Sequence, residues 1–110
     1  MGKTVRKYWD CFLVFWGVRF GFGDMTIERH RCLQRDLRRV YPECSLRVFL
    51  DGEDVTDRCV QAFQATRPPS LSRDGRVITY RSWLLLYPPG RRRPGQLRQV
   101  IHSDFEWRIV

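Results

Sequence analysis

Residues 46–59 constrain the fold most, because an alternating apolar run, a turn signal and a polar return strand follow one another without a gap. Leu46, Val48 and Leu50 fall on one face of an extended strand, where side chains alternate with a period of two. The dipeptide Asp51-Gly52 supplies the positive-φ residues that a tight hairpin turn requires. The stretch therefore predicts a β-hairpin that organises a sheet.

The hairpin is locally acidic. Its carboxylates do not follow the alternating ligand spacing of a calcium-binding loop, so we interpret them as turn and helix-cap residues. We expect Thr56 or Asp57 to cap a short helical turn that runs through Val60, Ala62 and Phe63. The carboxylates concerned are Asp51, Glu53, Asp54 and Asp57.

Residues 26–41 predict the one amphipathic helix of the chain. Thr26 is a good N-cap and Pro42 stops the helix, while apolar side chains recur at helical spacing at Leu33, Leu37, Val40 and Tyr41. The other side of the helix is basic, and Glu28 and Asp36 are close enough in sequence to pair with part of it. We interpret that side either as a solvated helix face or as a phosphate-contacting face. Its basic residues are Arg31, Arg35, Arg38 and Arg39.

The C-terminal part of the chain predicts a second, larger hairpin. Residues 67–75 have the composition of a loop, and residues 76–87 then read as one long strand. Prolines and glycines in residues 88–95 bracket three consecutive arginines, Arg91, Arg92 and Arg93, which places them at an exposed loop tip. Alternation over residues 101–110 predicts a half-buried strand that ends the chain.

The aromatic residues 1–24 leave several structures open. A basic start and an apolar middle are similar to a secretory signal, but Asp10 and Arg19 interrupt the run and no small-residue cleavage site follows. The apolar run is too short to span a bilayer of roughly 30 Å as a helix, so we expect no membrane anchor. The alternatives are a strand or irregular segment packed on the sheet, or an extension before a module that begins at Met25. We therefore divide the chain into residues 1–24 and a single α+β domain over residues 25–110.

Charge is distributed unevenly along the chain. The formal net charge is +8, and Lys3 and Lys7 are the only lysines among 20 basic residues. This bias is typical of GC-rich coding genomes, although the planar arginine fork also suits phosphate recognition. Residues 67–98 hold eight arginines and one acidic residue, whereas residues 45–66 carry a balance of minus two. We therefore expect another macromolecule to bind at the basic parts of the chain.

The sequence contains no recognisable catalytic or metal-binding motif. The cysteines Cys11, Cys32, Cys44 and Cys59 lie at intervals of 21, 12 and 15 residues, so they form no CxxC pair, and we expect them to be reduced, buried thiols. Cys59 and His102 offer a dyad only by chance, because no nucleophile elbow, HExxH motif or spaced carboxylate pair supports one. We predict a non-enzymatic protein without a metal or cofactor.

Two kinds of partner fit this layout, a protein or a nucleic acid. An arginine-tipped β-ribbon can follow a nucleic-acid groove, and Tyr80, Trp83 and Tyr87 offer rings for stacking on unpaired bases. Aromatic residues at strand spacing are more often core residues, so a protein-binding or assembly role is the leading hypothesis. The candidate contact residues for either partner are Arg91, Arg92, Arg93, Arg98, Arg31, Arg35, Arg38 and Arg39.

Short uncharacterised proteins of bacteriophages and prophages in GC-rich hosts carry a V-x-V-D-G-x-D-V-T-x-R-C hairpin and close on a strand. This chain resembles them in the string Val48-Phe49-Leu50-Asp51-Gly52-Glu53-Asp54-Val55-Thr56-Asp57-Arg58-Cys59 and in its last six residues. The N-terminal 44 residues and the arginine loop depart from that pattern. The resemblance implies a phage origin, and a location in the cytoplasm of a bacterial host or in a virion, rather than an activity.

The elements together predict an α+β fold in which one amphipathic helix packs on an antiparallel sheet of about four to five strands. We expect a small basic accessory or assembly protein of phage type that binds another macromolecule through a basic face. The alternative is a nucleic-acid-binding protein that uses the arginine-tipped hairpin loop.

Overall fold

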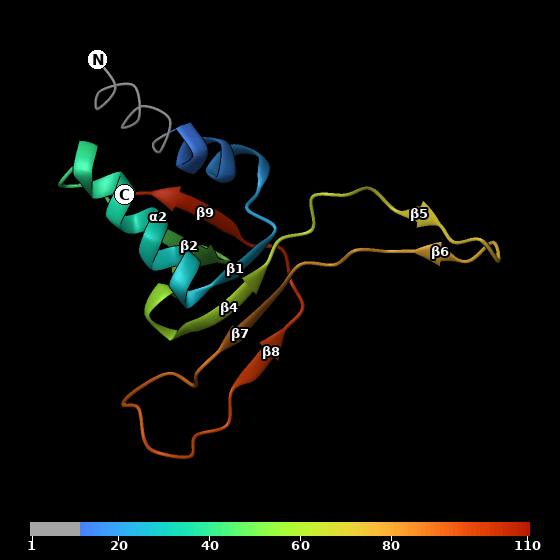
Figure 1. Cartoon of the computed structure of the whole chain (residues 1–110). Coiled ribbons are helices and arrows are strands. Elements are labelled where there is room, and N and C mark those ends of the chain that lie inside the picture. The colour runs from blue at the N-terminus through green and yellow to red at the C-terminus, as the bar shows by residue number, and fades with distance from the viewer. Residues whose placement is uncertain (1–11) are drawn as a thin grey trace.

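The computed structural model describes residues 12–110 (Figure 1), so the basic start of the chain lies outside the described residues. Residues 12–20 are helical. The elements that follow are β1 (Asp24–Thr26), α2 (Ile27–Val40), β2 (Leu46–Leu50), β3 (Glu53–Asp54), the 3-10 turn η1 (Thr56–Arg58), β4 (Cys59–Phe63), β5 (Ser70–Leu71), β6 (Val77–Ile78), β7 (Trp83–Leu86), β8 (Gln99–Ile101) and β9 (Glu106–Ile109).

The prediction of one helix on one sheet of four to five strands is wrong. The described residues form two helices and three antiparallel sheets, with the strand orders β1-β4-β7-β8, β3-β2-β9 and β5-β6. The predicted final strand accounts for part of the error, because it is divided between two sheets. Its first residue, Ile101, belongs to β8, which pairs with β7, and residues 106–109 form β9, which pairs with β2. Alternation identifies extended chain, but it does not identify the neighbouring strand.

Residues 12–20 are a helix rather than a strand or irregular segment, which was one of the alternatives left open. Val14, Gly17 and Val18 follow the spacing i, i+3, i+4 and turn toward the protein interior, where Val14 and Gly17 are buried. The helix ends at Gly21, whose φ is +97° and whose N–H donates to the Gly17 carbonyl at 2.8 Å. The helical spacing is thus found among the small inward-facing residues, and the many aromatic residues around them hide it in the sequence. No helix among the described residues is long and apolar enough to cross a bilayer.

The predicted helix 26–41 is confirmed as α2. Thr26 is its N-cap, and the Thr26 hydroxyl oxygen accepts a hydrogen bond from the Arg29 N–H at 3.2 Å. Leu37 is fully buried where α2 packs against β1, β2 and β4. Figure 1 shows α2 lying across the strands, with the helix 12–20 beside it.

The predicted first hairpin is also confirmed. β2 pairs with β3 in the register Phe49↔Asp54 and Leu50↔Glu53, and the turn residues Asp51 and Gly52 have φ values of 51° and 81°. The predicted helical turn is wrong beyond Arg58. Val60, Ala62 and Phe63 belong to β4, because that strand pairs with β1 on one edge and with β7 on the other.

The predicted long strand 76–87 is interrupted. β5 and β6 form a separate two-stranded arm that projects away from the rest of the molecule (Figure 1). Pro68 and Pro69 lie between the β4–β7 ladder and the β5–β6 ladder. Because proline has no N–H, it cannot donate to a ladder, and residues 79–82 belong to no strand in this region.

Side chains of α2 complete the hydrogen bonding of β2. The Leu46 N–H donates to Gln34 Oε1 at 2.7 Å, and His30 Nε2 donates to the Leu46 carbonyl at 2.8 Å. Gln34 also donates to the Cys44 carbonyl at 3.1 Å. These contacts fix α2 against β2 and leave the arginine side of the helix turned outward.

Replacing Gln34 with Met tests this role of the glutamine. Gln34→Met keeps the side-chain volume but leaves the buried Leu46 N–H without its acceptor, so we expect a loss of about 1–3 kcal/mol in the free energy of unfolding. Urea unfolding followed by circular dichroism measures it. Arg35→Met on the exposed side of α2 is the matched control, and equal losses in both variants would contradict the assignment.

Replacing Gly17 with Ala tests the close packing of the helix 12–20. A Cβ at Gly17 would lie 1.9 Å from Phe22 Cε1, and Phe22 is buried at 8% exposure in edge contact with Trp107. Although alanine favours an exposed helix by about 1 kcal/mol over glycine, we expect Gly17→Ala to lower the free energy of unfolding by about 1–3 kcal/mol. Leu13→Ala, at a side chain 60% exposed, is the control. An increase in stability for Gly17→Ala would contradict this packing.

Candidate binding surfaces

Four arginines of α2 gather around one open groove. Arg31, Arg35, Arg38 and Arg39 are all exposed and line it together with Gln34. This places the four helix arginines of the sequence prediction on a common solvent-facing sector. We call this sector the basic face.

Few groups neutralise the basic face. Asp36 lies 3.7 Å from both Arg35 Nε and Arg39 Nη1, and these contacts are exposed enough to contribute little. Arg38 donates to the Ser45 hydroxyl at 3.2 Å, and Arg31 has no ion pair among the described residues. Glu28, which we expected to pair, makes no ion pair with a described residue. The face therefore remains positive.

The arginine loop, residues 87–98, joins β7 to β8 and carries Arg91, Arg92, Arg93 and Arg98 at exposed positions. Gln96 closes the loop on itself, because it accepts from the Arg93 N–H at 3.0 Å and donates to the Arg91 carbonyl at 3.3 Å. Arg92 folds back: its guanidinium lies 4.3 Å from the centre of the Tyr87 ring and donates to the Asp57 carbonyl. The three consecutive arginines thus do not form one cluster at the tip.

The aromatic residues beside this loop already have partners. Trp83 stacks on Phe63 with ring centres 6.1 Å apart, and the Tyr80 hydroxyl is 3.4 Å from that of Ser70. The guanidinium of Arg92 covers one face of Tyr87. One face of Trp83 and one face of Tyr87 are therefore already covered, which reduces the ring surface left for stacking on unpaired bases.

Sequence reasoning missed an apolar surface on the helix 12–20, which we call the aromatic surface. Leu13, Trp16 and Phe20 line a groove with Leu33 and Arg29 of α2, and the Trp16 and Phe20 rings stack at 4.4 Å. The exposed fraction is 60% for Leu13 and 54% for Phe20. The spacing of Val14, Gly17 and Val18 was the signal that would have placed these bulky residues outside.

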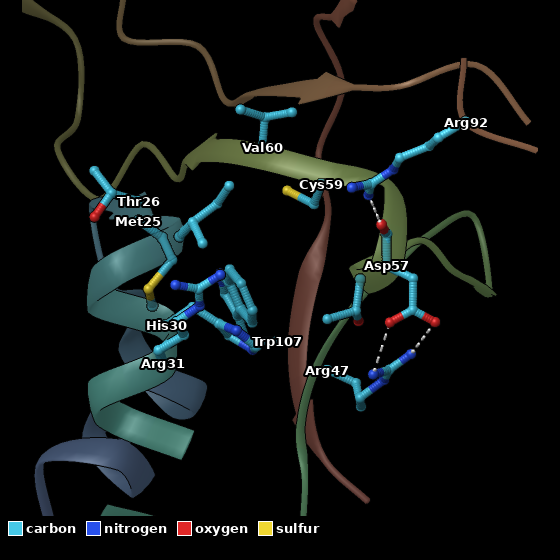
Figure 2. Close-up of a pocket in the computed structure, with 12 residues that line it drawn as sticks. Met25, Thr26, His30, Arg31, Arg47, Asp57, Cys59, Val60, Arg92 and Trp107 are labelled. Atoms are coloured by element: carbon cyan, nitrogen blue, oxygen red, sulfur yellow. Dashed lines mark hydrogen bonds and ion pairs between the residues drawn. The ribbon is translucent and has the colours of Figure 1, made fainter. Parts of the chain in front are cut away.

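A cavity of about 250 Å³ lies between α2 and the segment that joins the hairpin to β4. Figure 2 shows Met25, His30 and Arg31 on the helix side, and Arg47, Asp57 and Arg92 on the opposite side. Trp107 of β9 forms part of the wall. Its side chain is 4% exposed, and its Nε1–H has no acceptor among the described residues. Arg31 lines both this cavity and the basic face.

The carboxylates of the hairpin serve the turn and one arginine. Asp54 accepts from Arg47 Nε at 2.8 Å and from the Thr56 N–H at 3.0 Å. Asp57 accepts from the same guanidinium at 3.3 and 3.4 Å. Desolvation alone raises the pKa of Asp54, but the hydrogen bonds from Arg47 and Thr56 outweigh it and hold that pKa below its ordinary value. Arg47 is thereby committed to its two carboxylates.

The described cysteines carry no sign of a reactive or metal-bound thiol. Burial raises the pKa of Cys59 to about 11, so this thiol is protonated at neutral pH. Cys59 and Cys44 are half-buried, whereas Cys32 is exposed, contrary to the expected burial. Cys11 lies outside the described residues. Among residues 12–110, no group of three or more His, Cys, Asp or Glu residues is placed to hold a metal ion.

No protein-family model matches this chain, and neither a curated protein nor a solved structure matches it.

Replacing Asp54 with Asn tests the charge pair with Arg47. A carboxylate whose pKa is lowered on folding stabilises the protein above its unfolded pKa, near 3.8, and the effect disappears as the pH falls through the lower folded value. We expect Asp54→Asn to be less stable by about 1–2 kcal/mol at neutral pH. The difference should shrink below pH 3.8 in urea unfolding at a series of pH values. A difference that stays constant down to the acid limit would contradict the role of the charge.

Proposed function

We propose that this chain is a small non-enzymatic accessory or assembly protein of phage type that binds an acidic protein partner through the basic face of α2. One observation carries the proposal: four arginines converge on one open groove, and within residues 12–110 only Asp36 forms an ion pair with them. Such a surface steers an anionic partner and rejects basic ones.

The aromatic surface favours a protein partner over a nucleic acid. Trp, Phe and Arg are enriched in protein interfaces, where large rings and guanidinium groups provide most of the binding energy. Arg29 and Leu33 of α2 border this surface, so the same helix connects it to the basic face. A partner that covers both the basic face and the aromatic surface would need acidic groups next to apolar groups.

A nucleic acid is the second candidate, and the exposed Arg91, Arg93 and Arg98 support it. Contacts of this kind neutralise phosphates and make affinity strongly dependent on salt. The internal contacts of Arg92 and Tyr87 remove the central arginine and a stacking ring from that surface. The arginine loop is therefore the weaker of the two candidate interfaces.

The phage-type origin rests on the resemblance of residues 48–59, and it suggests a location in the cytoplasm of a bacterial host or in a virion. A partner protein in either place would need an acidic surface with apolar residues at its centre.

Binding to a fluorescein-labelled acidic peptide of alternating Glu and Leu residues, followed by fluorescence anisotropy, tests the proposal. We expect the triple variant Arg35→Gln/Arg38→Gln/Arg39→Gln to lose about tenfold in affinity or more. The variant Arg67→Gln/Arg73→Gln/Arg76→Gln removes the same charge near and on the β5–β6 arm, and it should lose much less. Trp16→Ala should weaken binding of this peptide but not of poly-glutamate.

Equal losses in the two charge-matched triple variants would mean that only net charge matters, and would reject the basic face as a site. A parallel titration with a DNA duplex separates the second candidate. Duplex binding that exceeds peptide binding, and that falls in Arg91→Gln/Arg93→Gln, would favour the nucleic-acid function instead.

A further inference from the structure

The cavity between α2 and the hairpin segment is lined by two arginines that have no carboxylate partner among the described residues. Arg31 has no ion pair among the described residues, and Arg92 makes only a cation–π contact with Tyr87 and a hydrogen bond to the Asp57 carbonyl. Both side chains line the cavity, one from each side (Figure 2). Two guanidinium groups therefore remain available to a ligand.

Of the described carboxylates, Asp57 lines the cavity, and it already has a partner. Figure 2 shows the Asp57 carboxylate directed at Arg47, which donates to both of its oxygens at 3.3 and 3.4 Å. Asp54 holds the same arginine at 2.8 Å. Arg47 pairs with Asp57, whose side chain stays 87% exposed, and Arg31 and Arg92 add positive charge that is not paired with a carboxylate among the described residues.

The remaining wall is suited to an organic group. Met25, Ile27, Val60 and Trp107 supply apolar surface. Trp107 is 4% exposed, and its Nε1–H, which is closed off from solvent, has no acceptor among the described residues. A volume of about 250 Å³ is that of roughly eight water molecules, more than a phosphate group alone fills.

We infer that this cavity binds a small organic phosphate monoester. A guanidinium can donate two parallel N–H groups to two oxygens of a phosphate, and two arginines balance the two negative charges of a monoester. The apolar wall and the ring of Trp107 would contact the esterified group. This inference is independent of the proposed function, although Arg31 belongs to both surfaces.

Two-dimensional ¹H–¹⁵N NMR titration with AMP and with glycerol 3-phosphate tests the inference, with inorganic phosphate and adenosine as comparison ligands. We expect saturable shifts that include the indole N–H of Trp107, identified as the signal absent from Trp107→Phe. Preference for AMP would mark a nucleotide as the source of the monoester, and preference for glycerol 3-phosphate a non-nucleotide ester. Adenosine binding as tightly as AMP would overturn anion recognition, and inorganic phosphate binding as tightly as both esters would overturn the ester class.

Three single variants test whether monoester binding depends on this cavity. Arg31→Gln and Arg92→Gln should each weaken monoester binding about tenfold or more, whereas Arg35→Gln, one turn along α2 and outside the cavity, should leave it unchanged. Equal affinity in all three, or an equal loss in all three, would overturn the site. Arg92→Gln should retain binding of the Glu-Leu peptide, so loss of phosphate binding and loss of the proposed partner surface are separate results.

Discussion

The main-chain polar groups of β2 must all be paired, and much of the structure follows from how this is achieved. β9 pairs with one edge of the strand. On the other edge, Gln34 and His30 serve Leu46, while Thr56 and the Val55 N–H serve Val48 at 2.8 and 3.0 Å, and β3 completes the strand. Because an unpaired buried amide costs as much as a lost hydrogen bond, this edge brings α2, η1 and the hairpin to defined positions. The orientation of α2 then turns its arginines outward.

Many arginines of this basic chain stabilise the fold rather than offering charge to a partner. Arg29 donates to the Asp24 carbonyl at 2.6 Å and to the Phe22 carbonyl at 3.0 Å, and Arg58 donates to the Tyr87 carbonyl at 3.0 Å. Arg47 is engaged by Asp54 and Asp57, whereas Arg92 donates to one carbonyl and has no carboxylate partner among the described residues. A guanidinium provides several donors in a fixed fork, so it can satisfy carbonyl groups where the strands end. Net charge alone therefore overstates the surface that is free to bind.

Arg31 lies where the basic face and the cavity meet, and this adjacency links two kinds of recognition. The basic face is open and suits a large anionic partner, whereas the cavity is more recessed, between Trp107 and the hairpin segment, and suits a small ligand. A ligand that engages Arg31 in the cavity would withdraw one of the four arginines from the groove. The two surfaces therefore share charge, and occupancy of one would alter the other.

Local chemistry allowed part of the fold and of the site to be predicted. Thr26 and Pro42 mark the two ends of α2, Asp51-Gly52 sets the turn of the first hairpin, and the arginine spacing of α2 predicts its basic face. These features were predictable because caps, turns and helical periods depend on neighbours in sequence. The division of the strands into three sheets, the burial of Val14 behind the aromatic surface, and the return of Arg92 onto Tyr87 were not predictable in this way. Each depends on contacts between residues far apart in the chain, such as Arg92 with Asp57 and Trp107 with Phe22. The sequence by itself thus determined the local elements and their charge. Only the tertiary structure decided which arginines are free to bind a partner, because the remaining arginines pair with backbone and side-chain groups that are distant in the chain.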